Sequence, residues 1–282
     1  MTTSITVGTI RITALNDGVS RLPPMLYPGL DFDAHPELLE NDGMYHIPAG
    51  CFLIQGDAFT ILVDAGIGPA NISFPADLGV AAGLTPPPEF IAEGGRLPDE
   101  LAAAGVAPED VTTVFLTHLH GDHVGWVAPG GTPFFPNAEV VYGAADWDAL
   151  IAPASADDPA RIGMEAAKAA GVLRAIDATI VEIAPGVTAL HTPGHTPGHY
   201  AVRVASDGEE VDLLGDAVHH PLQLTDTGIS FLTDVDAKHA LQTREELFAL
   251  VAGTDVAIGM AHLPGLDFQR ITEHDGRTWS DV

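Results

Sequence analysis

The chain has 282 residues, 46% of them hydrophobic and 18% charged, which is typical of a folded globular protein and excludes an intrinsically disordered one. Its 39 acidic residues outnumber its 11 basic residues and give a formal net charge of −28 at pH 7. Nucleic-acid phosphates and anionic lipid headgroups bind clustered Lys and Arg, so we expect neither a nucleic-acid partner nor a membrane partner. We expect a single domain over residues 1–282.

The lone cysteine, Cys51, excludes an intrachain disulfide. It lies in an apolar stretch, so we expect it in the core and not as a nucleophile. The N-terminus lacks a basic start followed by an apolar segment, and no apolar run approaches the length of a membrane span. We therefore expect a cytoplasmic protein.

Apolar stretches in the first third predict strands over residues 5–15, 51–55 and 59–64. Between the first two, residues 21–46 are rich in Pro, Leu and Asp and predict a long ordered loop. Such a loop is either a wall of a substrate pocket or a surface excursion whose aromatic side chains pack on the core. A second loop is predicted over residues 66–95.

The rest of the chain alternates between strand and helix patterns. We predict helices over residues 97–104, 144–151, 158–172 and 236–251. We predict strands over residues 111–117, 138–142, 178–183, 187–191, 200–204, 210–214 and 256–259. Strand-rich stretches broken by helices in both halves suggest two sheets packed face to face with helices outside.

The densest cluster of polar residues is Thr117-His118-Leu119-His120-Gly121-Asp122-His123, directly after the strand predicted over residues 111–117. Side chains two apart on an extended chain point the same way, so His118 and His120 can close on one cation. Gly121 permits a sharp turn that aims Asp122 and His123 at a second cation. Imidazole and carboxylate without thiolate suit zinc, and also iron, manganese, cobalt or nickel.

Further candidate ligands lie at the ends of other predicted strands. His195 sits between two Pro-Gly turns that hold it at a kinked strand end, whereas His191 and His199 are expected either to support a ligand through a hydrogen bond or to be structural. Asp216 follows an apolar strand and Gly215, and its two oxygens could bridge two cations. His262 follows the strand predicted over residues 256–259.

Together these residues resemble the metallo-β-lactamase superfamily. The matching elements are Leu62-Val63-Asp64-Ala65-Gly66, the motif from His118 to His123, His195, Asp216 and His262, in the family's order. The resemblance implies an α+β fold, the αββα sandwich, with two mixed sheets face to face, helices outside and a metal site at one edge. It implies one metal on His118, His120 and His195, a second on Asp122, His123 and His262, and Asp216 bridging them. Asp64 would support a ligand without binding metal.

The resemblance also implies a hydrolase. A hydroxide shared by two divalent metals is the expected nucleophile, because coordination lowers the pKa of water to about 7 in zinc enzymes. Two divalent cations, two aspartates and one hydroxide together carry a formal charge of roughly +1. A positive site favours binding of a polarised carbonyl or phosphoryl oxygen. We expect zinc, with manganese, iron or cobalt as alternatives. Asp122 is expected to carry a proton to the leaving group.

Within the superfamily, the chain is most similar to the N-acyl-homoserine lactonase and methyl-parathion-hydrolase-like branch, through residues 12–18, 215–223, 234–236 and 243–244. This implies cleavage of a small-molecule lactone or ester. The alternatives are a phosphotriester hydrolase, a glyoxalase-II-like thioesterase, an iron-dependent oxidoreductase and a metal-binding protein without catalysis. The lactonases often have a tyrosine three residues after the bridging aspartate. Here that residue is His219, expected either to donate to substrate or to hydrogen-bond a ligand carboxylate. The expected partner is a small-molecule substrate, and a homodimer is an alternative to a monomer.

Overall fold

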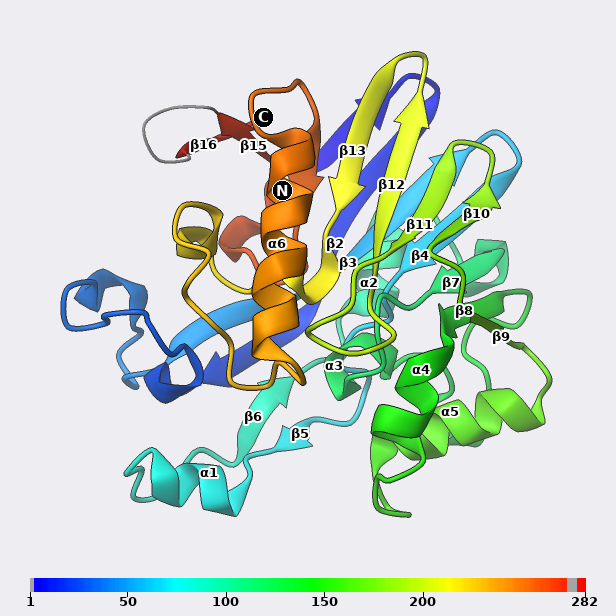
Figure 1. Cartoon of the computed structure of the whole chain (residues 1–282). Helices are drawn as coiled ribbons and strands as arrows, with labels where there is room; N and C mark the ends of the chain where they lie inside the picture. The colour runs from blue at the N-terminus through cyan, green and yellow to red at the C-terminus, as the bar shows by residue number, and fades with distance from the viewer. Residues whose placement is uncertain (1–2, 273–277) are drawn as a thin grey trace.

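Two β-sheets pack face to face in the computed structural model, which describes residues 3–272 and 278–282 (Figure 1). The first sheet contains β1 (Ser4–Val7), β2 (Ile10–Leu22), β3 (Tyr45–Gly56), β4 (Phe59–Val63), β5 (Ile72–Ser73), β6 (Phe90–Glu93), β7 (Thr113–Phe115), β8 (Glu139–Gly143) and β9 (Leu173–Ile176). Its order is β5-β6-β2-β3-β4-β7-β8-β9, with β1 against β2. Strands β4, β7, β8 and β9 are parallel, and the other pairs are antiparallel.

The second sheet follows the chain in the order β10-β11-β12-β13-β14-β15-β16. Its strands are β10 (Ile180–Ala184), β11 (Val187–His191), β12 (Tyr200–Ser206), β13 (Glu209–Leu213), β14 (Ala257–Gly259), β15 (Gln269–Thr272) and β16 (Thr278–Asp281). Within the described part of this second sheet, β13 and β14 pair in parallel and the other pairs are antiparallel. Both sheets are therefore mixed, as the αββα sandwich requires.

Helices cover the outer faces of both sheets (Figure 1). The α-helices of the described residues are α1 (Ala76–Ala81), α2 (Leu97–Ala103), α3 (Gly121–Val124), α4 (Ala144–Asp146), α5 (Pro159–Ala169) and α6 (Ala237–Val251). Helix α1 lies apart from the covered faces, next to β5 and β6 (Figure 1). Leu101 of α2 and Met164 of α5 pack on the first sheet, and Phe248 of α6 packs on the second. Asp158 and Asp236 cap α5 and α6 by accepting backbone N–H groups of the first turn. No helix among the described residues is long and apolar enough to cross a membrane.

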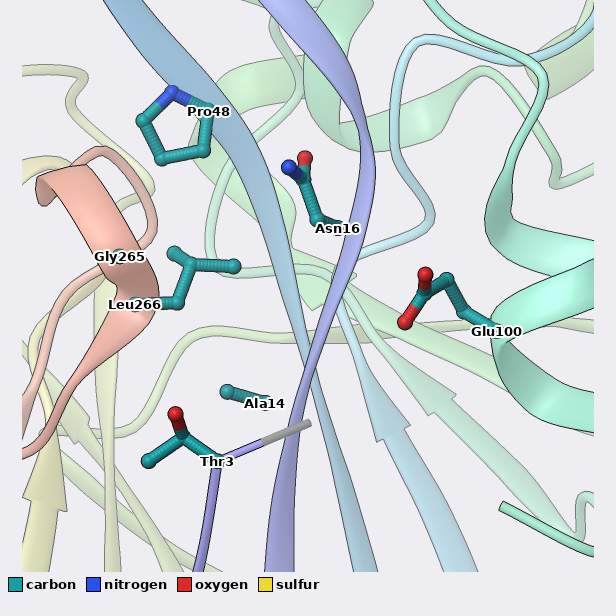
Figure 2. Close-up of a pocket in the computed structure, with 7 residues that line it drawn as sticks. All are labelled: Thr3, Ala14, Asn16, Pro48, Glu100, Gly265 and Leu266. Atoms are coloured by element: carbon teal, nitrogen blue, oxygen red, sulfur yellow. The ribbon is translucent and has the colours of Figure 1, made fainter. Parts of the chain in front are cut away.

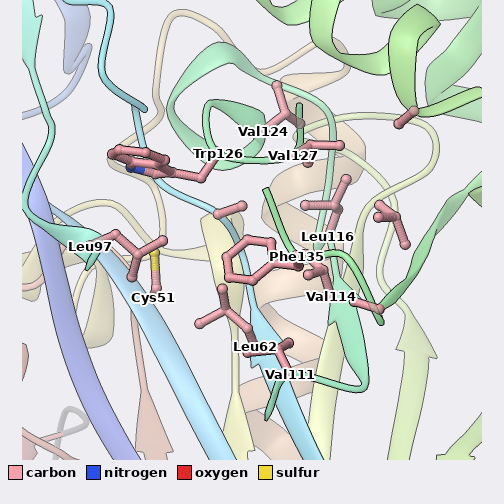
Figure 3. Close-up of a cluster of buried hydrophobic side chains, with 14 of the residues drawn as sticks. Cys51, Leu62, Leu97, Val111, Val114, Leu116, Val124, Trp126, Val127 and Phe135 are labelled. Atoms are coloured by element: carbon pink, nitrogen blue, oxygen red, sulfur yellow. The ribbon is translucent and has the colours of Figure 1, made fainter. Parts of the chain in front are cut away.

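The central strand β3 is buried on both faces, and its side chains alternate between two hydrophobic layers. Cys51 and Leu53 face the helices over the first sheet, a layer shown in Figure 3, whereas Phe52 and Ile54 face the second sheet. This alternation is the period of two expected for a strand. Cys51 is fully buried and its pKa is raised by burial, so its predicted place in the core is confirmed.

Several predicted boundaries were wrong. The strand predicted over residues 5–15 is two strands, β1 and β2, because Gly8 adopts a positive φ of 54° and turns the chain. Pairing of β2 with β3 continues through a bulge as far as Leu22 and Tyr45, so the loop predicted over 21–46 is shorter than expected. The strand predicted over 111–117 ends at Phe115, because the Thr117 N–H donates to the Asp64 carboxylate and not to a neighbouring strand.

Other elements were missed. The segment predicted as a loop over residues 66–95 contains β5, α1 and β6. The helix predicted to residue 172 ends at Ala169, since Gly171 adopts a φ of 74° and β9 begins two residues later. Strands β15 and β16 extend the second sheet, and residues 1–2, part of the N-terminal stretch discussed above, lie outside the described residues.

Replacing Leu53 by Ala is expected to lower the free energy of unfolding by about 2–5 kcal/mol, because Leu53 is fully buried and the substitution leaves a cavity. The matched control is Leu250→Ala on α6, where the side chain is 60% exposed, and it should change stability by about 0.5 kcal/mol or less. Urea unfolding at constant pH measures both. Equal losses in the two variants would contradict this view of the core.

Candidate metal centre

The structure brings the predicted metal ligands together at one edge of the two sheets. His118 and His120 follow β7, Asp122 and His123 lie on α3, His195 precedes β12, Asp216 follows β13 and His262 follows β14. They form two groups in which the donor atoms lie within 4.8 Å of one another. Group one is His118, His120, His195 and Asp216, and group two is Asp122, His123 and His262.

Group one converges on one point. His118 Nε2 lies 2.9 Å and His195 Nε2 lies 3.0 Å from His120 Nδ1. Two nitrogens bound to a tetrahedral zinc at about 2.0–2.1 Å would be about 3.3 Å apart. Three ring nitrogens this close cannot each carry a proton, so a cation suits them better than a hydrogen-bond network.

Asp216 faces both groups with its two carboxylate oxygens. Its Oδ2 lies 3.4 Å from His195 Nε2, and its Oδ1 lies 3.3 Å from His123 Nε2 and 3.2 Å from His262 Nε2. Burial raises the pKa of this carboxyl, but the surrounding histidines, His123 foremost, hold it well below its usual range. Asp216 is therefore an ionised carboxylate placed between the two groups.

Most of the histidine rings are oriented by a hydrogen bond at Nδ1, the ring nitrogen that faces away from the centre. The Nδ1 atoms of three rings lie at hydrogen-bond distance from an acceptor: Thr117 Oγ1 at 3.1 Å for His118, Asp234 Oδ1 at 2.9 Å for His195 and the Pro48 carbonyl at 2.8 Å for His262. His123 Nδ1 lies 2.9 Å from Asp64 Oδ2 in an ion-pair contact without a hydrogen bond. A ring that donates through Nδ1 presents the lone pair of Nε2. These rings thus direct their free lone pairs toward the centre.

Buried polar atoms at the centre fit two divalent cations. His123 Nε2 and Asp216 Oδ1 are buried and make no hydrogen bond, although they are 3.3 Å apart. Burial is the main cause that lowers the pKa of His118 and of His195, which favours neutral imidazoles. Unpaired buried polar atoms cost free energy, and a cation would compensate that cost. Imidazole nitrogens with carboxylates are a donor set that suits Zn²⁺.

Helix α6 holds two of the ligand-bearing segments. Thr243 donates to the carbonyl of Pro193, next to the His195 turn. The buried Arg244 donates to the carbonyls of Ala217 and Ile229, which flank the Asp216 segment. At Gly194, with a φ of 138°, an added Cβ would lie 2.3 Å from the Ala240 backbone nitrogen, so only glycine allows the turn to approach the helix this closely.

His191 and His199, on either side of His195 in the sequence, make supporting contacts, as predicted. His199 Nε2 accepts the backbone N–H of Asp216 at 3.0 Å. Burial lowers the pKa of His199 to about 4, so its ring is neutral and free to accept. His191 Nε2 lies 3.0 Å from the carbonyl of Pro197. Neither residue belongs to the two groups.

His219 contacts both a candidate ligand and the cavity over the centre. Its Nε2 lies 3.1 Å from Asp216 Oδ2, so it contacts a candidate ligand carboxylate. Its ring packs on Phe231, with centroids 4.1 Å apart, and it also lines the cavity described next. Asp234, whose Oδ1 contacts His195 Nδ1, lies in a segment that carried the resemblance but was not predicted to support a ligand.

A cavity of about 270 Å³ lies over the two groups. Its polar lining includes His120, Asp122, Asp216, His219 and His262. Its apolar lining includes Leu22, Leu26, Ile47, Leu78, Ile91 and Phe231. Leu26 belongs to the long loop after β2, whose Tyr27 and Phe32 are packed in a buried cluster. The loop is therefore both a wall of the cavity and a segment that packs its aromatic side chains on the core.

A separate cavity of about 260 Å³ lies beside β2 and β3, lined by Thr3, Ala14, Asn16, Pro48, Glu100, Gly265 and Leu266 (Figure 2). Its lining contains no histidine and one carboxylate, that of Glu100. It therefore lacks the chemistry of the candidate metal centre.

A family model of the metallo-beta-lactamase superfamily matches residues 48–262. The chain belongs to this superfamily. The resemblance and the fold class predicted from the sequence are both confirmed.

Relatives in this superfamily are named as lactonases. An N-acyl homoserine lactonase from Bacillus sp is 27% identical over 185 residues, which cover 63% of this chain and 66% of that protein. One from Bacillus cereus is 28% identical over 192 residues, covering 66% and 69%. The chain thus matches just under two thirds of the length of the first of these relatives.

Solved structures in the superfamily share the whole fold. The hydrolase AbOPH superposes with a TM-score of 0.81 at 23% identity, covering 100% of this chain and 97% of that one. AidC, a dizinc quorum-quenching lactonase solved in complex with a product, superposes with a TM-score of 0.80 at 20% identity and the same coverage. At these identities the superpositions establish the fold.

Asp146, on α4, connects this helix to the segment after His195, close to the candidate metal centre. Its buried carboxylate accepts Thr196 Oγ1–H at 2.9 Å and Gly198 N–H at 2.6 Å. Burial raises its pKa from 3.8 to about 6, because a charged carboxylate loses its hydration there.

Asp146→Asn is expected to change how stability depends on pH. The folded state binds the Asp146 proton more tightly than the unfolded state, so this residue contributes most stability below pH 4 and loses it as pH rises to about 6. The wild-type free energy of unfolding should fall by about 2–3 kcal/mol relative to the variant across that window and stay level above it. Urea unfolding from pH 4 to 8 measures the difference. The exposed Asp148→Asn is the control, and an equal slope in it would contradict the assignment.

Asp234→Asn is expected to weaken metal binding by about 10-fold or more, because the variant loses the charged acceptor that orients His195. Asp236→Asn is the matched control: Asp236 caps α6, and Asn caps helices equally well. Titration against a chromophoric chelator measures the affinity. Identical affinities in the two variants would show that Asp234 does not support the ligand.

Proposed function

We propose that this chain is a metal-dependent hydrolase that cleaves a small-molecule lactone or carboxylic ester. The observation that carries the proposal is the Asp216 carboxylate, placed between two His/Asp groups beneath an apolar cavity. Two divalent metals, for which we propose zinc with manganese, iron or cobalt as alternatives, would supply a hydroxide nucleophile at neutral pH and a Lewis acid for a carbonyl oxygen.

The proposed roles of the residues follow from their places. His118, His120 and His195 would hold one ion, and Asp122, His123 and His262 the other, with Asp216 shared between them. The Asp122 side chain is 24% exposed and lines the cavity, whereas that of Asp216 is 4% exposed. Asp122 can therefore reach a substrate atom, and we assign it the proton that the leaving group takes up.

The substrate class follows from the cavity and the charge. Leu22, Leu26 and Phe231 offer apolar contact, and the net charge of −28 disfavours anionic partners such as nucleic acid. The relatives named as N-acyl homoserine lactonases support a lactone as the first substrate class to test. His219 would position Asp216 through its 3.1 Å contact. A phosphotriester is the second substrate class to test, since its oxygen would also be polarised by two cations.

Chelation is expected to abolish hydrolysis, and zinc, manganese or cobalt should restore it. The assay is a panel of lactones, carboxylic esters, thioesters and phosphotriesters run on each metal-loaded protein. Asp216→Ala should lose bound metal and activity together. Asp122→Asn should keep at least one metal, with kcat lower by about 10²–10⁴. Glu182→Gln, exposed on β10, is the control and should match wild type.

Each other outcome has a distinct meaning. Full turnover by metal-free protein would end the proposal. Phosphotriesters cleaved faster than every lactone and ester would reverse the order of substrates. One bound iron with oxygen uptake would favour a redox enzyme, and two bound metals with no hydrolysis across the panel would favour a metal-binding protein without catalysis.

A further inference from the structure

The cavity beside β2 and β3 is built from parts of the chain that are distant in sequence, and none of the candidate metal ligands lines it (Figure 2). We call it the β2 cavity; its volume is about 260 Å³. Figure 2 shows the Glu100 side chain directed from α2 toward β2. Pro48 belongs to β3, and Gly265 and Leu266 lie in the turn after β14. The β2 cavity therefore exists only in the folded chain.

The polar side chains of the β2 cavity offer mainly hydrogen-bond acceptors. The Glu100 carboxylate makes no hydrogen bond or ion pair with any residue that the structure describes. Thr3 Oγ1 donates its proton to Asp267 Oδ1 at 3.0 Å, so its lone pairs can still accept. Asn16 Oδ1 accepts the Gly18 N–H at 3.1 Å and keeps a second lone pair. This lining favours a ligand that donates several hydrogen bonds.

The charge of the β2 cavity favours a cation. Glu100 is its one charged lining residue, and neither Lys, Arg nor His lines it. Asp267, hydrogen-bonded to Thr3, adds a second carboxylate close by. These oxygen atoms are fewer than the roughly six to eight that Ca²⁺ takes. An ammonium group needs fewer acceptors, since one carboxylate and two neutral oxygens can receive all its protons.

The rest of the lining is apolar. Ala14, Pro48 and Leu266 present carbon atoms to the β2 cavity, and contact with a short hydrocarbon chain would remove this surface from water. The volume of about 260 Å³ lies below the roughly 300–1,000 Å³ of sites that enclose a drug-sized ligand. The cavity thus suits a smaller molecule with one charged end and one apolar end.

Two walls of the β2 cavity also hold His262, a candidate metal ligand. Pro48 lines the cavity, and its carbonyl accepts the His262 Nδ1–H at 2.8 Å. On the other side, the Leu266 N–H donates to the Leu263 carbonyl at 3.0 Å and closes the turn that begins directly after His262. One wall thus orients the ring of the ligand, and the other shapes the turn next to it.

Close packing joins these two walls. A Cβ added at Gly50 would lie 2.5 Å from the Ala261 carbonyl oxygen and 2.6 Å from Leu266 Cδ2, so β3 and the turn touch without a side chain between them. Leu266 also adopts a φ of 53°, in the left-handed region that residues with a side chain rarely occupy. Because such a conformation persists only when its surroundings hold it, a molecule that packs on Leu266 stabilises the turn.

We propose that the β2 cavity binds a small organic ammonium compound, an amine with a short hydrocarbon chain, and that its binding strengthens metal binding at the centre. The ammonium group lies at Glu100, and the hydrocarbon chain packs on Pro48 and Leu266. A filled cavity opposes displacement of these two residues and so keeps His262 oriented toward the metal. By linkage, the amine and the metal raise each other's affinity by the same factor.

Amine binding is measured on the zinc-loaded protein from the shifts of backbone amide NMR signals during titration with n-butylammonium chloride. Wild type should bind this probe at least about tenfold more tightly than 1-butanol, with shifts at Ala14, Asn16 and Leu266. Glu100→Gln should weaken binding by about tenfold. Asp99→Asn is the matched control, because Asp99 precedes Glu100 on α2, is exposed and does not line the cavity. It should bind the probe as wild type does.

A charge reversal shows that a loss of binding is not a loss of folding. Glu100→Lys should no longer bind n-butylammonium and should instead bind butyrate, which wild type should not bind. Equal weakening in Glu100→Gln and Asp99→Asn would assign the binding to the acidic surface as a whole and overturn the proposal. Equal affinity of wild type for the ammonium compound and the alcohol would overturn it as well.

The link to the metal centre is measured by zinc titration against a chromophoric chelator. Saturating n-butylammonium should raise the zinc affinity of wild type by about fivefold or more over sodium chloride of equal ionic strength. The amine should have little effect on Glu100→Gln, which excludes direct competition of the amine for zinc. An unchanged zinc affinity in wild type would contradict the link. Neither readout uses turnover, so failure here is distinct from failure of the hydrolase function.

Discussion

A single buried carboxylate, Asp216, governs the arrangement of this molecule. Placing an ionised group in the interior is costly unless opposite charge or hydrogen-bond donors surround it. Here histidines from several elements surround the Asp216 carboxylate and compensate that cost. His199 also accepts a hydrogen bond from the Asp216 backbone N–H. Strands β7, β13 and β14 all end at this point. The sandwich is thus built so that one edge collects polar side chains while the layers between sheets and helices stay apolar.

The polar edge is rigid because each contributing segment is tied to a different part of the chain. Asp64 accepts from Thr117 and contacts His123, so β4 fixes the segment after β7. Asp146 fixes the turn after His195, and α6 fixes that turn from the other side. Preorganisation of this kind lowers the cost of orienting ligands when a cation binds. Stability and metal affinity are therefore linked through the same contacts.

The sequence predicted those features that are local. His118, His120, Asp122 and His123 lie within six residues, so strand geometry alone indicated two clustered binding points. Asp216 and His262 are single residues at strand ends, and only the family resemblance joined them to the cluster. Asp234 was missed because its partner His195 is 39 residues away and no local pattern marks the pair. The predicted strand boundaries were wrong where a turn or a side-chain acceptor ended the hydrogen bonding between strands, as at Gly8 and Thr117.

Helix α6 has a consequence that reaches beyond its packing on the second sheet. Its Thr243 and Arg244 hold carbonyls on both sides of the centre, so opening of its middle turns releases His195 and Asp216 together. By linkage, a cation that binds only the closed centre must make that opening less favourable by its binding free energy. Amide hydrogen exchange along α6 would therefore report occupancy of the centre from the outside of the molecule. Conversely, substitutions on its solvent face, which touch no ligand, become a means to tune affinity for metal.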